Sequence, residues 1–175
     1  MLLNTTPAKK TALAAVLCAL AICLALVENA LPLMLVIPLP GIRLGLANLV
    51  TVFALYYLGF TPALTVLVLR CVLTAVLSGT VSALAFSLCG GLLALIAMAL
   101  LMRVRVFSVW GVSVGGAAMH NVGQIIAAIF VLGGTQPLFY LPWLLIAGAV
   151  CGAFTGLVST LLFRALESTV MKKYR

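Results

Sequence analysis

The sequence predicts an all-α integral membrane protein, a bundle of six transmembrane helices. Of its 175 residues, 66% are hydrophobic and only 7% are charged, whereas soluble domains carry about 25% charged residues. Apolar runs long enough to cross a bilayer recur along the whole chain. Glycine and proline separate these runs into six segments. We predict that they form one membrane domain over residues 1–175.

The first three predicted helices cover residues 11–31, 44–58 and 62–78. Pro32 ends the first helix, and the GFTP sequence at 59–62 ends the second. Pro62 suits the first turn of the third helix, where a backbone N–H has no intrahelical partner to lose. The second helix is short for a membrane span.

The link at residues 32–43 is apolar but rich in proline. Proline lacks a backbone N–H and restricts the residue before it, so a continuous helix is disfavoured there. Irregular backbone at membrane depth must be covered by protein or line a wet cavity. We therefore expect this outer loop to fold over the bundle as a cap.

The last three predicted helices cover residues 82–102, 108–132 and 140–168. A loop that contains Arg103 and Arg105 separates the first two of these helices. The GGTQP sequence at 133–137 separates the last two.

The net charge of +8 comes mainly from basic residues near the two chain ends and in one loop. These residues are Lys9, Lys10, Arg103, Arg105, Arg164, Lys172, Lys173 and Arg175. Basic loops stay on the cytoplasmic side of a membrane, and six spans place both termini on the side of the arginine loop. We predict a multi-pass protein of the cell membrane with both termini in the cytoplasm. The charge is not taken as a sign of nucleic-acid binding.

Residues for catalysis and metal binding are scarce. Glu28 and Glu167 are the only acidic residues, so this chain cannot supply an aspartate-held magnesium site. It has no P-loop for ATP hydrolysis. Its five cysteines lie in apolar runs without a Cys-x-x-Cys pair, and it has one histidine. We expect no enzyme activity, no metal and no cofactor.

Small residues form stripes on two predicted helices, where they allow close helix packing. Gly148, Gly152 and Gly156 share one face of the last helix, and packing within this chain is the favoured interpretation. The first helix has two such stripes, one with Ala15 and Ala19 and one with Ala21 and Ala25. It is thus able to face both its own bundle and a partner.

Polar side chains inside the membrane mark candidate binding sites, because burying them in lipid is expensive. The candidates are Glu28, Asn29, Arg43, Asn48, Arg70, His120, Asn121 and Gln124. From the cytoplasmic end, Arg70 lies ~12 Å along its helix and His120 ~18 Å along its own. The set therefore runs from the outer surface to mid-bilayer. It predicts a pocket open to the outside for an anionic or strongly hydrogen-bonding ligand.

His120 and Gln124 are four residues apart and share a helix face, whereas Asn121 points about 100° away. Asn121 is therefore assigned either to the ligand or to a hydrogen bond with a neighbouring helix. A purely structural alternative also stays open. In it, Glu28 neutralises Arg70 or Arg43, and His120 only satisfies a helix contact.

The segments PGIRLGLANLV (40–50) and HNVGQ (120–124) carry a resemblance to a known family. The chain resembles the Gx transporter family, often labelled heptaprenyl diphosphate synthase component I. That family is similar to the substrate-binding S components of energy-coupling factor (ECF) vitamin transporters. The resemblance implies a six-helix, S-component-like fold that binds a small molecule from the outside under the loop-one cap.

The resemblance also implies partners. A separate transmembrane T component and ATPase subunits would supply the power, and small residues of the first helix would meet the T component. Ala15 and Ala19 are the positions most like that contact, with Ala21 and Ala25 at the same spacing. One alternative function is a non-catalytic membrane subunit of a prenyl diphosphate synthase. Another is a small channel or proton-coupled carrier that works alone.

Overall fold

The computed structural model describes residues 6–30, 45–79 and 81–173. The elements are α1 (Pro7–Ala30), α2 (Asn48–Tyr57), α3 (Phe60–Ser78), α4 (Val81–Leu101), α5 (Val109–Leu132), the 3-10 helix η2 (Gln136–Tyr140) and α6 (Leu141–Lys173). The described ranges contain no strand, which confirms the all-α prediction.

Five of the six α-helices (α1, α3, α4, α5 and α6) are long and apolar enough to cross a membrane. The chain is therefore a multi-pass membrane protein. The exception is α2, which was expected over 44–58 but has only 10 residues. These rise about 15 Å, half of a hydrocarbon core of about 30 Å. α2 alone is too short to cross, and the six-span arrangement stays a prediction.

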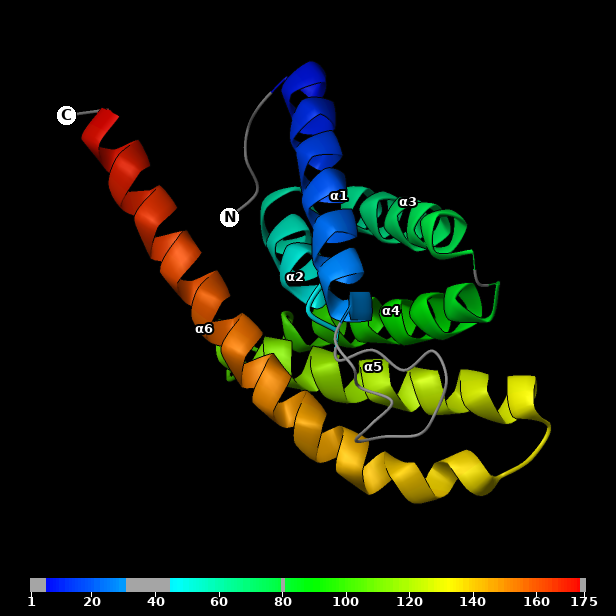
Figure 1. Ribbon diagram of the computed structural model, residues 1–175. Helices are drawn as coiled ribbons and strands as arrows, with labels where there is room; N and C mark the ends of the chain where they lie inside the picture. The colour runs from blue at the N-terminus through cyan, green and yellow to red at the C-terminus, as the bar shows by residue number, and fades with distance from the viewer. Residues whose placement is uncertain (1–5, 31–44, 80, 174–175) are drawn as a thin grey trace.

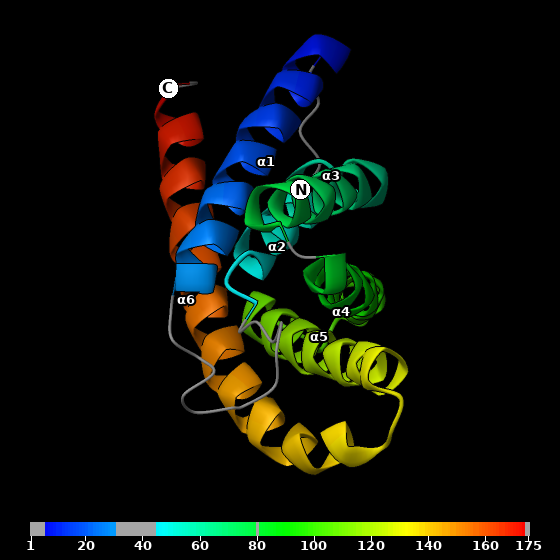
Figure 2. The ribbon, with the colours of Figure 1, turned by 45° about the vertical axis from the view of Figure 1, so that its right-hand side comes forward.

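Three of the long helices form a layer, and the other two cross it. Figures 1 and 2 show α3, α4 and α5 side by side in that order, with α1 and α6 crossing them at steep angles. α1 packs against α3, and α6 packs against α5.

The short helix α2 occupies the centre of the bundle. It contacts α1, α3, α4, α5 and α6, and seven of its 10 residues are buried. Phe53 stacks on Tyr57 with ring centroids 4.5 Å apart, and both rings contact Phe163 of α6. Tyr56 joins the same aromatic cluster, 5.3 Å from Phe163. All five long helices therefore contact α2 in the described structure.

Glycines in the left-handed region end the helices where the sequence predicted breaks. Gly79 caps α3 with φ +67°, and Gly133 caps α5 with φ +71°. Gly59, with φ +92°, lies immediately before α3. α1 begins at Pro7, one turn earlier than expected, because proline is compatible with a first helical turn. The predicted cap at 32–43 lies outside the described residues.

The glycine stripe of α6 packs on α5, as predicted. A Cβ on Gly152 would lie 2.7 Å from the Val114 Cα, and one on Gly156 would lie 3.0 Å from the Trp110 Cα. A side chain at Gly152 would push the two helices apart, and one at Gly156 would make a tight contact with the α5 backbone. The stripe therefore acts inside this chain.

The two alanine stripes of α1 have different surroundings. Ala21 and Ala25 are buried in the bundle, at 0% and 1% exposure. Ala15 and Ala19 are exposed. Of these two pairs, only Ala15 and Ala19 are accessible to another protein.

Candidate ligand-binding site

The Glu28 carboxylate joins the end of α1 to the start of α2. Its Oε1 accepts a hydrogen bond from the backbone N–H of Gly45 at 2.5 Å, and its Oε2 accepts one from Leu46 at 3.2 Å. The α2 N-cap residue, Ala47, offers no side chain for these donors. A buried carboxylate from another helix therefore satisfies backbone N–H groups ahead of α2, where the helix dipole favours negative charge.

Asn48 and His120 converge beside Gly45. Gly45 has φ +85°, and a Cβ there would lie 2.9 Å from Asn48 Nδ2 and 3.3 Å from His120 Cδ2. The absence of a side chain thus lets the start of α2 approach the middle of α5. This contact places two of the predicted site residues together.

His120 and Gln124 form the pair that helical spacing predicted. Their Nε2 atoms lie 3.2 Å apart, and both side chains are buried. Asn121 points away from them and donates from Nδ2 to the Leu144 carbonyl of α6 at 2.5 Å. Of the two roles left open for Asn121, the structure shows the helix contact.

Arg70 enters the core from α3 and is only 3% exposed. Its Nε and Nη2 atoms have no hydrogen-bond partner among the described residues. A Cβ on Gly91 of α4 would lie 3.4 Å from Nη2, and a Cβ on Gly90 would lie 2.9 Å from the His120 ring. Adjacent residues differ by about 1.5 Å along a helix. Arg70 and His120 therefore reach the same level of α4, where the two glycines make room for them.

Two buried hydroxyl groups that the sequence analysis missed accompany Arg70. Thr74 follows Arg70 by one turn of α3, and Ser87 precedes Gly91 by one turn of α4. Each is 1% exposed, and neither hydroxyl has a partner in the described part of the chain. Because α3 and α4 run antiparallel (Figure 1), both lie toward the same end of Arg70. Two features of the sequence could have indicated these hydroxyl groups. A Gly-Gly pair lies within a predicted membrane span, and polar residues lie one helical turn from that pair and from Arg70.

Several buried polar atoms of the site have no hydrogen-bond partner. Among the described residues, these atoms are Arg70 Nε and Nη2, Asn48 Nδ2 and Oδ1, Gln124 Oε1, Thr74 Oγ1 and Ser87 Oγ. Leaving such atoms unpaired in a protein interior costs about 1–3 kcal/mol each. Native proteins pair nearly all of them with protein, water or ligand. The set suits a ligand with an anionic group for Arg70 and mixed donors and acceptors elsewhere.

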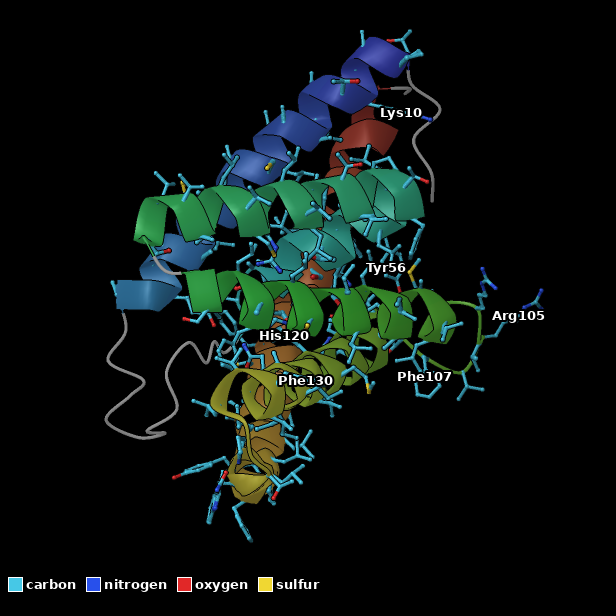
Figure 3. The ribbon with its side chains drawn as sticks, turned by 90° about the vertical axis from the view of Figure 1, so that its right-hand side faces the viewer. Lys10, Tyr56, Arg105, Phe107, His120 and Phe130 are labelled. Atoms are coloured by element: carbon cyan, nitrogen blue, oxygen red, sulfur yellow. The ribbon has the colours of Figure 1, made fainter. Side chains whose placement is uncertain are left out.

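The described side chains of the site are buried, and the predicted opening to the outside stays a prediction because residues 31–44 lie outside the described ranges. Glu28, Asn48, Arg70, His120 and Gln124 are at most 4% exposed. Close approach at Gly45 and Gly90 brings α2 and α4 against His120 of α5 at these residues. Arg43 and the side chain of Asn29 lie outside what the structure describes. Figure 3 shows His120 in the interior, away from the end of the molecule that carries Tyr56 and Arg105.

A comparison with known protein families matches residues 17–162 to the family described as heptaprenyl diphosphate synthase component I. No curated protein and no solved structure gives a significant match. The matched segment covers most of the chain and contains every site residue described above. The chain therefore belongs to the heptaprenyl diphosphate synthase component I family.

Proposed function

We propose that this chain is the substrate-binding S component of an ECF-type importer in the cell membrane, with both termini in the cytoplasm. In this role it binds a small anionic or strongly hydrogen-bonding molecule from the outside and catalyses no reaction. The observation that carries the proposal is the buried Arg70 guanidinium, two of whose nitrogens have no hydrogen-bond partner among the described residues.

The cost of burying Arg70 supports a ligand-binding role. An arginine at the centre of a membrane helix costs about 2.5–3.5 kcal/mol on insertion scales, and such residues mark functional sites by default. A carboxylate or phosphate group bonds a guanidinium in bidentate geometry. Asn48, Gln124, Thr74 and Ser87 are available for the uncharged part of the same ligand.

The position of the site supports capture from the outside. Arg103 and Arg105 follow α4 and are exposed, so the positive-inside rule places that loop in the cytoplasm. Figure 3 shows Lys10 and Arg105 toward one end of the molecule, with His120 away from that end. With that end in the cytoplasm, His120, midway along α5, lies near mid-bilayer, and Glu28, near the end of α1 away from Lys10, lies toward the outside.

The surface of α1 supports a membrane partner. Ala15 and Ala19 are one turn apart and exposed, and small residues at this spacing allow close helix contact. The chain has no P-loop, so the energy for import comes from separate ATPase subunits. We assign Ala15 and Ala19 to the T-component contact.

The family description favours a second candidate, a non-catalytic membrane subunit of a heptaprenyl diphosphate synthase. The chain contains no aspartate, so the aspartate-held magnesium of prenyl transfer would have to come from another subunit. In this role the present chain would hold the soluble subunit at the membrane or handle its substrate.

Purification of the tagged chain from its native membrane in mild detergent separates the two candidates. The importer proposal predicts that a T component and two ATPase subunits co-purify. Ala15→Leu combined with Ala19→Leu should release them, whereas Val16→Phe on the neighbouring exposed face should not. Recovery of an aspartate-rich soluble prenyl synthase subunit, inactive without this chain, would reject the importer in favour of the second candidate.

A further inference from the structure

A second site lies at the opposite end of α2 from Glu28. Here the end of α2, the turn into α3 and the end of α4 enclose a groove of about 670 Å³. Its apolar lining includes Leu55, Tyr56, Phe60, Ile96, Ala99 and Leu100. Phe60, Ile96 and Leu100 are 46%, 46% and 56% exposed, so the groove opens to the surroundings of the protein.

The groove has a basic rim. Arg103 is among its lining residues, and Arg105 follows two positions later; both are exposed. The one carboxylate among the described side chains, Glu28, is engaged by backbone N–H groups at the start of α2. The described structure therefore leaves the positive charge of this rim open to an anion from outside the chain.

Exposed aromatic residues indicate that this rim lies at the membrane surface. Phe107 and Trp110 follow the two arginines and are 45% and 42% exposed. Figure 3 shows Tyr56, Arg105 and Phe107 at the same end of the molecule. Aromatic belts and flanking arginines are typical of the level of the lipid headgroups. The apolar part of the groove then extends into the hydrocarbon region.

We infer that this groove binds an anionic phospholipid of the cytoplasmic leaflet, with an acyl chain along the apolar lining and the phosphate at Arg103 and Arg105. An apolar groove alone would accept any acyl chain, and a basic loop alone would attract any anionic headgroup. Together they favour a molecule that carries both an acyl chain and an anionic headgroup. Basic pockets between transmembrane helices bind anionic lipids in this way. The site is separate from the Arg70 site, so neither assignment depends on the other.

Native mass spectrometry of the purified full chain tests the assignment, with phosphatidylglycerol or phosphatidylcholine added at equal concentration. Phosphatidylglycerol should bind more tightly than phosphatidylcholine. Arg103→Gln should weaken phosphatidylglycerol binding about fivefold, whereas Arg164→Gln, which removes an exposed arginine of α6, should leave it unchanged. Ile96→Trp should block the groove. Val150→Trp at an exposed site on α6 is its matched control.

Equal binding of the two lipids, or wild-type binding by both Arg103→Gln and Ile96→Trp, would overturn the assignment. Since both positions are exposed, the variants should keep the wild-type elution profile in size-exclusion chromatography. If the two variants retain phosphatidylglycerol but lose a co-purifying membrane subunit, the groove is a protein-docking surface instead.

Discussion

The contact between α4 and α5 at Gly123 gives the most specific prediction. A Cβ on Gly123 would lie 2.6 Å from the Cys89 carbonyl oxygen and 2.7 Å from the Gly90 Cα, both backbone atoms. Restoring a 3.4 Å contact requires the two helices to move apart by about 0.8 Å. Overpacking costs about 1–3 kcal/mol, offset by up to about 1 kcal/mol from the better helix propensity of alanine. Gly123→Ala should therefore destabilise the protein by about 1 kcal/mol, the centre of the overpacking range less the propensity gain.

Gly115 provides the matched control on the same helix. A Cβ at Gly115 would meet only the Leu101 side chain, whose nearest atom is the terminal Cδ1 methyl and which is partly exposed and able to change its rotamer. In a thermal denaturation assay in detergent, Gly123→Ala should lower the midpoint by about 2–4 °C. Gly115→Ala should stay near the wild-type value. Equal shifts for the two variants, or a Gly123→Ala midpoint at or above wild type, would refute the argument from backbone contact.

Three further predictions concern contacts between elements and are measured by unfolding in mixed micelles. Glu28→Ala should lower the free energy of unfolding by about 2–4 kcal/mol because two backbone N–H groups lose a charged acceptor. Glu28→Gln should recover part of this stability. Equal stability of both variants and the wild type would contradict the capping role. Asn121→Ala should lower the free energy of unfolding by about 1 kcal/mol and should keep a co-purifying small molecule bound. Gln124→Ala should release that molecule. Release by Asn121→Ala but not by Gln124→Ala would contradict the roles assigned to the two residues. Gly152→Ala should destabilise the protein by about 1 kcal/mol after the same propensity offset, because its Cβ would lie 2.7 Å from the Val114 Cα in α5. An unchanged unfolding midpoint would count against this packing.

Local sequence signals predicted most helix boundaries. α3, α4 and α5 begin and end within two residues of their predicted limits, because glycine, proline and polar turns interrupt otherwise apolar runs. α2 differs more, since it begins at Asn48 instead of residue 44. Its start depends on the left-handed backbone of Gly45 and on Glu28, a residue 17 positions earlier in the chain. A contact so distant in sequence leaves no local signal.

Helical periodicity predicted the relative directions of the site residues on α5. It placed His120 and Gln124 on one face and Asn121 on another, and the structure confirms this. It did not show that Gly90 and Gly91 of α4 make the space for His120 and Arg70. Glycine in a membrane helix serves many packing roles, so only the assembled bundle identifies which side chains fill the space. The hydrogen-bond partners of Glu28 could not be predicted either, because they are backbone N–H groups and residue identities do not reveal them.

Native mass spectrometry of the wild-type protein and of Arg70→Gln tests most directly the claim that Arg70 binds an anionic small molecule. Both proteins are purified from native membranes in mild detergent, with Arg164→Gln as the control for loss of an exposed arginine. The wild type and Arg164→Gln should retain a small anionic molecule, and Arg70→Gln should lose it while keeping the wild-type elution profile. Retention of the same bound mass by Arg70→Gln, or its absence from all three proteins, would contradict the assignment of Arg70 to a ligand.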